Sequence, residues 1–146
     1  MLTPDVNVLL AAYRADHPHH RPAREWLTQT LAGLAAGGRL TLLPMVCAAF
    51  VRLATHGRVF TVPATAAEAL AFLDALAAAP GCEMQALGSE WPAFAALCRA
   101  RALAGNLVQD AWIAAAARVA GATLVTFDRD FEALLEPHER RILSIA

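Results

Sequence analysis

The chain has 146 residues and a mass of 15.5 kDa, which is the length of one domain. Hydrophobic residues make up 58% of it and charged residues 17%, a balance that excludes a disordered or charge-rich coil. The net charge of −1 excludes a uniformly basic surface, so we expect any polyanionic partner to be held by local arginines or through a bound cation.

Short apolar runs alternate with longer Ala- and Leu-rich segments, which is typical of βα units around a parallel sheet and predicts an α/β fold. Local signals mark the boundaries: Pro44 is expected to begin a helix, Gly121 to end one, and Thr65 with Glu68 has the spacing of a capping box. In chain order we expect a strand at 2–3, a helix at 6–15, a polar turn at 16–22, a helix at 23–36, a strand at 39–43, helices at 44–55 and 65–79, a strand at 83–87, helices at 89–104 and 107–120 with Asn106 as the cap of the latter, a strand at 123–126, a short helix at 128–135 and a strand at 140–145.

The sequence shows no sign of a membrane or secretory protein. No segment has the roughly 20 apolar residues that a membrane-spanning helix requires, and the N-terminus lacks the basic start and apolar run of a signal peptide. The cysteines Cys47, Cys82 and Cys98 are odd in number and lack metal-ligand spacing, so we expect buried, reduced thiols and a cytoplasmic location. The high hydrophobic content predicts an apolar surface that another chain covers.

Three aspartates follow predicted strands or begin the helices beside them. Asp5 comes directly after the first strand and Asp128 after the strand at 123–126, while Asp110 lies near the start of the helix that leads into that strand. Ligands of open parallel sheets bind beyond the carboxyl ends of the strands. We therefore expect these three carboxylates to meet at one edge of the sheet.

Carboxylates that lie close together repel one another, and a divalent cation removes that repulsion. A ligand set of oxygens alone favours Mg²⁺, or Mn²⁺, over zinc, and such an ion suits the hydrolysis of phosphate esters. Each aspartate also has a simpler interpretation. Asp5 and Asp128 would cap the helices that follow them, and Asp110 would complement the dipole of its helix.

Four segments of the chain form a recognisable set. They are Asp-Val-Asn-Val-Leu-Leu at 5–10, Phe-Val-Arg-Leu at 50–53 with Thr-His-Gly-Arg-Val-Phe at 55–60, Val-Gln-Asp-Ala-Trp-Ile-Ala at 108–114, and Leu-Val-Thr-Phe-Asp-Arg-Asp-Phe at 124–131. In this order, and over nearly the whole length, the chain resembles the PIN domain family, and within it the VapC-type toxins of bacterial toxin–antitoxin systems.

This resemblance implies a single domain over residues 1–146, with three α/β/α layers and a short, mostly parallel sheet. It implies a Mg²⁺-dependent endoribonuclease toxin that acts on RNA, forms a homodimer and is neutralised by a cognate antitoxin. The metal-binding and catalytic acids would be Asp5, Asp110 and Asp128, with Asn7 and Thr126 supporting them and Asp130 as an auxiliary acid or only a helix-start residue.

One position departs from the family pattern. The family usually carries a Glu just before the Phe-x-Arg signature, and this chain has Ala49 there. Three acids still suffice for one Mg²⁺, so we expect a nuclease with a weakened metal site. The alternative is a catalytically weakened PIN-like module that binds RNA or protein. A receiver-like phospho-acceptor domain also clusters aspartates, but it needs a lysine, and the chain has none.

Two arginines and a histidine run complete the candidate residues. Arg14 and Arg52 lie near the ends of the first and third predicted helices, where they would contact RNA or the antitoxin unless they are ordinary surface residues. The run at 17–20, His-Pro-His-His, resembles a metal tract but lacks partner ligands elsewhere. We expect it to form a solvated loop near the mouth of the active site.

Overall fold

The computed structural model describes residues 1–145, which form a five-stranded sheet with all strands parallel. Strand β1 lies at the centre of the order β3-β2-β1-β4-β5. Parallel strands need crossover connections, and the helices supply them, as the alternating sequence pattern predicts. The strands are β1 (Leu2–Pro4), β2 (Leu40–Leu42), β3 (Cys82–Met84), β4 (Thr123–Thr126) and β5 (Arg140–Ile142).

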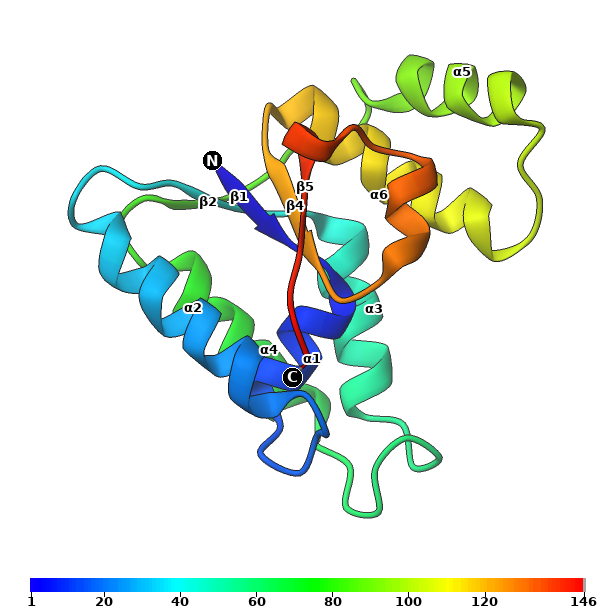
Figure 1. Ribbon diagram of the computed structural model, residues 1–146. Helices are drawn as coiled ribbons and strands as arrows, with labels where there is room; N and C mark the ends of the chain where they lie inside the picture. Colours follow the sequence, from blue (N-terminus) through cyan, green and yellow to red (C-terminus); the bar gives the residue numbers. More distant parts are fainter. Residues whose placement is uncertain (146) are drawn as a thin grey trace.

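Helices cover both sides of this sheet, which gives the expected three-layer α/β/α architecture. In Figure 1, α2 and α4 lie on one side of the strands, and α5 and α6 lie on the other. The helices are α1 (Val6–Tyr13), α2 (His20–Leu34), α3 (Pro44–Ala54), α4 (Ala66–Ala77), α5 (Trp91–Arg101) and α6 (Asn106–Ala120), followed by the short 3₁₀ turns η1 (Arg129–Ala133) and η2 (Pro137–Glu139).

The core sits between the sheet and its helices. Five consecutive residues of α1, from Val8 to Ala12, are buried, so this helix has no solvent-facing side over that length. On α6, Ala111 and Ala114–Ala117 are buried, and their small side chains allow close packing. This packing places α1 and α6 against β4, the strand that Asp128 follows.

The register of β1 and β4 brings Asp5 and Thr126, two of the predicted site residues, to the carboxyl edge of the sheet. Leu2, Thr3 and Pro4 of β1 pair with Thr123, Leu124 and Val125 of β4. Asp5 therefore follows β1 beside the end of β4, and its backbone amide donates a hydrogen bond to the carbonyl of Val125 (2.9 Å).

Several element boundaries differ from the sequence prediction. Helix α2 begins at His20, not at residue 23, because Pro22 is tolerated in a first turn, where its missing amide has no helical partner. The cap of α6 is Gly105 and not Asn106, because the cap backbone has φ +64°, a value that glycine adopts without strain. The strand expected at 83–87 is shorter, and the helix expected at 128–135 is a 3₁₀ turn.

The sequence also predicts that the three cysteines are buried and that no helix spans a membrane. Cys47 is buried, but Cys82 and Cys98 are only half-buried, which corrects the expectation that all three are core residues. All three thiols are free. Among residues 1–145, no helix combines the length and apolar character that crossing a membrane requires.

Candidate metal centre and active-site pocket

Asp5 and Thr126 are joined at the centre of the site. Asp5 is 5% exposed and Thr126 is fully buried, each at the carboxyl end of its strand. The hydroxyl of Thr126 donates to Asp5 Oδ2 (2.7 Å), and the amide of Val6 donates to Asp5 Oδ1 (2.7 Å). Both carboxylate oxygens of Asp5 are thus held in place before any ligand arrives.

Asn7 and Thr126 connect this pair to the loop after β4. The Asn7 side chain donates from Nδ2 to Thr126 Oγ1 (3.4 Å) and accepts from the amide of Phe127 at Oδ1 (3.3 Å). Thr126 Oγ1 also accepts from the amide of Asp128 (2.9 Å). Asp128 in turn caps η1, because its Oδ1 accepts from the amide of Asp130 (2.8 Å). Asn7 and Thr126 thus belong to the hydrogen-bond network around Asp5 and Asp128, and their role in supporting a metal site stays a prediction.

The other aspartates approach one another beside Asp5. Ligand oxygens of Asp110, Asp128 and Asp130 all lie within 4.8 Å of one another, close enough to share one cation. Asp5 is electrostatically coupled to both Asp110 and Asp128. Asp130, which the sequence left between two roles, joins this group of three. Asp5, which was expected to share the ion, is not among the residues whose ligand oxygens lie within 4.8 Å of one another, and it borders the group as a buried carboxylate coupled to it through charge.

The carboxylates repel one another and are partly removed from water. Burial raises the pKa of Asp5, the hydrogen bonds from Thr126 and Val6 lower it, and the charge of Asp128 raises it again. Burial raises the pKa of Asp110 to about 6, and Asp128, Asp5 and Asp130 add to this effect. These are the shifts expected of acids assembled for a cation.

A pocket of about 290 Å³ opens onto Asp5 and Asp110. Its walls come from α1, α3 and α6 and from the loop between α1 and α2. Ala49, which stands where the family pattern has a Glu, lines this pocket, and so does Arg52. Two polar lining residues, His17 and Gln109, were not named as site residues from the sequence, although a loop at the mouth of the site was expected around His17.

Arg14 has a different environment from Arg52. Its guanidinium bonds to both carboxylate oxygens of Asp16 (2.9 and 2.8 Å) and to the carbonyl of Val62 (2.8 Å), and it stacks on the ring of Phe60 at 4.1 Å. These contacts tie two loops together and occupy most of its donors. Arg52 is exposed and remains the better placed of the two to meet a phosphate.

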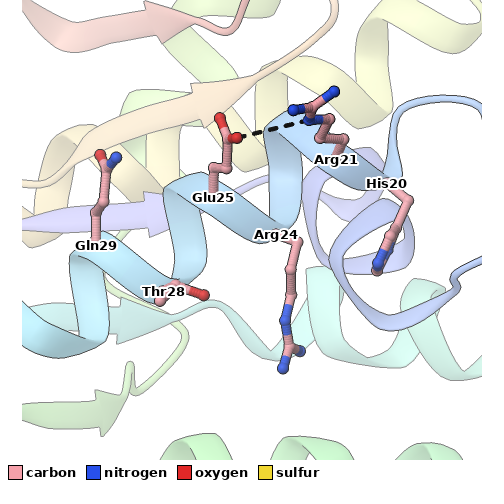
Figure 2. A pocket seen from close by; sticks show the side chains of 6 residues that line it. All are labelled: His20, Arg21, Arg24, Glu25, Thr28 and Gln29. Atoms are coloured by element: carbon pink, nitrogen blue, oxygen red, sulfur yellow. Dashed lines mark ion pairs between the residues drawn. The ribbon is translucent and has the colours of Figure 1, made fainter.

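A second hollow, of about 350 Å³, lies along α2, and unlike the pocket at Asp5 and Asp110 it is lined by no aspartate (Figure 2). Its one lining acid, Glu25, pairs with Arg21 on the preceding turn at 3.8 Å, as the dashed line in Figure 2 marks. His20 Nδ1 lies 2.7 Å from the carbonyl of Ala11 and so fastens α2 to α1. Because this hollow lacks a carboxylate cluster, we do not place the metal centre there. Its lining residues are His20, Arg21, Arg24, Glu25, Thr28 and Gln29.

Replacing Thr126 by Val should weaken both the fold and metal binding. The change leaves Asp5 Oδ2 and the amide of Asp128 without their shared partner, which costs about 1–3 kcal/mol in the free energy of unfolding. Loss of a supporting residue of this kind lowers metal affinity about 10- to 100-fold. Urea unfolding and Mn²⁺ titration would measure the two effects. Thr123→Val, on the same strand but away from the site, is the control, and an unchanged Mn²⁺ affinity in Thr126→Val would contradict the prediction.

The chain matches known proteins over most of its length. The family model of the PIN domain matches residues 2–135. Ribonuclease VapC31 of Mycobacterium tuberculosis (strain CDC 1551 / Oshkosh) is 41% identical over 128 residues, which are 87% of this chain and 88% of the relative. Ribonuclease VapC25 of Mycobacterium tuberculosis (strain ATCC 25618 / H37Rv) is 39% identical over the same shares of each chain.

A solved structure supports the same fold. VapBC2 from Rickettsia felis, bound to a DNA fragment from its promoter, superposes with a TM-score of 0.64 over 98% of both chains, at 16% identity. At that identity the likeness shows the fold alone. Together with the family match and the sequence relatives, the parallel sheet and the aspartates at its carboxyl edge show that this chain belongs to the PIN domain family, among the VapC ribonucleases.

Proposed function

We propose that this protein is a Mg²⁺-dependent endoribonuclease toxin that hydrolyses phosphodiester bonds in RNA. The observation that carries the proposal is the carboxylate cluster at the carboxyl edge of β1 and β4, with Asp5 buried and the pKa of Asp110 raised to about 6. Incubating RNA with the purified protein and Mg²⁺, with and without a chelator, tests it. Cleavage that the chelator abolishes supports the proposal, and no cleavage in either sample contradicts it.

The residues present fit a hard divalent cation. The donors are carboxylate oxygens alone, which suits Mg²⁺ or Mn²⁺ and disfavours zinc. We assign Asp5, Asp110 and Asp128 as metal-binding and catalytic residues, with Asp130 as an auxiliary acid. When bound, such an ion polarises a phosphoryl oxygen and lowers the pKa of a water molecule.

The protein's own contribution is to position charge. Thr126 and Val6 hold both oxygens of Asp5, so the carboxylate loses little freedom when a cation arrives. Asn7 fixes the loop that carries Asp128 by accepting from the amide of Phe127. Arg52, exposed at the wall of the pocket, would donate to a phosphate oxygen and offset its repulsion from the aspartates.

An additional acid at position 49 should strengthen this site. Ala49 lines the same pocket as Asp5 and Asp110, so a Glu there would add an oxygen ligand within the cluster. We expect Ala49→Glu to raise Mg²⁺ affinity about tenfold by isothermal titration calorimetry, the scale of about 1.4 kcal/mol. Ala48→Glu, which lines a neighbouring hollow and not this pocket, is the matched control. An unchanged affinity in Ala49→Glu would contradict the placement of the site.

The second candidate function is a PIN-like module that binds RNA or protein without cutting. The observation that favours it is the missing acid at Ala49, which leaves the α3 wall of the pocket without a carboxylate. This alternative predicts that RNA binds and stays intact when Mg²⁺ is present. The chelator experiment therefore separates the two candidates.

The partners and location follow from the proposed toxin role. We propose that a cognate antitoxin protein neutralises the chain, that the toxin forms a homodimer, and that it acts in the cytoplasm. Support comes from the antitoxin complex of the Rickettsia felis structure and from apolar surface such as Trp91, which is 60% exposed on α5. Sedimentation of the purified protein tests the dimer.

A further inference from the structure

The loop between α1 and α2 brings a histidine to the acidic pocket. His17 lines the pocket together with Asp5, Asn7 and Asp110. It belongs to neither the carboxylate cluster nor the hydrogen-bond network of Asn7 and Thr126. Its position raises the question of what an imidazole does beside a site built to receive an anionic substrate.

Backbone hydrogen bonding sets the tautomer of this imidazole. The amide of His19 donates to His17 Nδ1 (3.0 Å), so Nδ1 must act as an acceptor and carry no proton. In a neutral ring the proton then resides on Nε2. Burial lowers the pKa of His17, and His19 and His20 act in the same direction while Asp16 opposes them, so the neutral form predominates at neutral pH.

Ring contacts hold the loop against the catalytic edge of the sheet. The rings of His17 and His19 lie 5.6 Å apart, and the ring of His19 lies 5.1 Å from that of Phe127. Phe127 is the residue between Thr126 and Asp128, so the chain of rings connects His17 to the strand end that carries the acids. Within residues 1–145 no protein group bonds to His17 Nε2, and its N–H is left available to a ligand.

The pocket needs such a donor. A phosphodiester that approaches these carboxylates is repelled, so hydrogen-bond donors around the pocket must hold its remaining oxygens. Asn7 already donates to Thr126, which leaves Arg52, Gln109 and His17 as the polar side chains on the walls. In the described part of the chain, His17 is the one of these three side chains that both a backbone hydrogen bond and a neighbouring ring, that of His19, hold in place.

We infer that His17 is a substrate-binding residue whose Nε2–H donates to a phosphate oxygen of the RNA at the acidic pocket. This inference rests on the proposed ribonuclease function. His17 then has no role in holding the metal, and the histidine run at 17–20 contributes to substrate binding and not to metal binding.

Two substitutions separate the two nitrogens of the ring. His17→Asn supplies an oxygen that accepts from the amide two residues on, as Nδ1 does, but it does not extend to the position of Nε2. His17→Gln places an amide N–H near the position of Nε2 and gives up the Nδ1 acceptor. We expect His17→Asn to bind RNA about tenfold more weakly than the wild type, because it loses one hydrogen bond to a charged acceptor. The RNA affinity of His17→Gln should stay within about threefold of the wild type.

The probe is fluorescein-labelled single-stranded RNA of random sequence, with binding followed by anisotropy in Ca²⁺ and in EDTA. The control is His56→Ala, because His56 Nδ1 also accepts an amide two residues on, from Arg58 (3.0 Å), but the residue does not line the acidic pocket. Mn²⁺ affinity should be unchanged in all three variants, which distinguishes RNA contact from a role in the metal site.

The opposite pattern overturns the inference. If His17→Asn binds RNA like the wild type, or if His17→Gln loses RNA affinity and His17→Asn does not, then His17 only stabilises the conformation of its loop. The absence of RNA binding by the wild-type protein in either buffer also contradicts it. Failure of the proposed function is a separate result, because a wild-type protein that binds RNA but does not cleave it with Mg²⁺ refutes the ribonuclease and leaves the His17 comparison readable.

Discussion

Replacing Asp5 by Asn is expected to lower the rate of Mg²⁺-dependent RNA cleavage about a thousandfold or more while the fold survives. A divalent ion supplies several kcal/mol of transition-state stabilisation, and each 1.36 kcal/mol is a factor of ten in rate. Asn removes the charge that attracts the cation but keeps the size of the side chain and an oxygen that accepts from Thr126. Single-turnover cleavage of end-labelled RNA in Mg²⁺ measures the change.

The matched control is Asp74→Asn, an equivalent change at an exposed position on α4. It should cleave RNA like the wild type. Melting temperatures of both variants in EDTA establish that the fold is retained. Asp5→Asn gives up the hydrogen bond from the amide of Val6, which lowers stability, and removes a buried charge whose pKa is raised, which offsets that loss. Wild-type cleavage by Asp5→Asn would refute the assignment of the active site.

Without metal, the ionisation of Asp110 is expected to destabilise the fold as the pH rises through the window from about 4 to 6. The pKa of Asp110 rises from its ordinary value of 3.8 to about 6, so in this window the folded chain binds more protons than the unfolded chain. The contribution of Asp110 to the free energy of unfolding must then fall with rising pH. Allowing for solvent screening of a half-exposed group, the contribution of Asp110 is roughly 1 kcal/mol, or about 3 °C in melting temperature.

The comparison of Asp110→Asn with the wild type isolates this effect. Groups with a lowered pKa, such as His17 by burial and Glu139 by its hydrogen bond with Arg118, contribute stability that is lost as the pH falls. They oppose Asp110 but are common to both proteins. In EDTA, the melting temperature of Asp110→Asn should rise relative to that of the wild type as the pH increases across this window. Mg²⁺ should stabilise the wild type most above pH 6 and Asp110→Asn far less. Parallel melting curves for the two proteins in EDTA would contradict the prediction.

Much of the site could be predicted because the chain topology determines it. Asp5 and Asp128 directly follow β1 and β4, which are hydrogen-bonded neighbours, so a correct strand prediction already places these two acids close together. The interpretation of Asp5 and Asp128 as helix caps also holds, because Asp5 accepts from the amide of Val6 and Asp128 accepts from the amide of Asp130. Capping and clustering occur together here, because both depend on the residue directly after a strand.

Other features depend on packing that sequence spacing does not reveal. The sequence left Asp130 open as an auxiliary acid or only a helix-start residue, and its oxygen lies with those of Asp110 and Asp128 at the start of the 3₁₀ turn. His17 lies at the pocket in a loop whose His19 contacts the ring of Phe127, a residue far away in the sequence. Asn106 is not a cap because Gly105 takes the cap position with a positive φ, a choice that local residue preferences leave open.

Titration of the metal-free protein with Mn²⁺, followed by calorimetry near neutral pH, tests the central claim most directly. The account predicts that the wild type binds Mn²⁺ and that Asp5→Asn, Asp110→Asn and Asp128→Asn each weaken binding by about tenfold or more, while Asp74→Asn does not. Mn²⁺ affinity that stays the same in all three site variants would contradict it, because these aspartates would then hold no common cation.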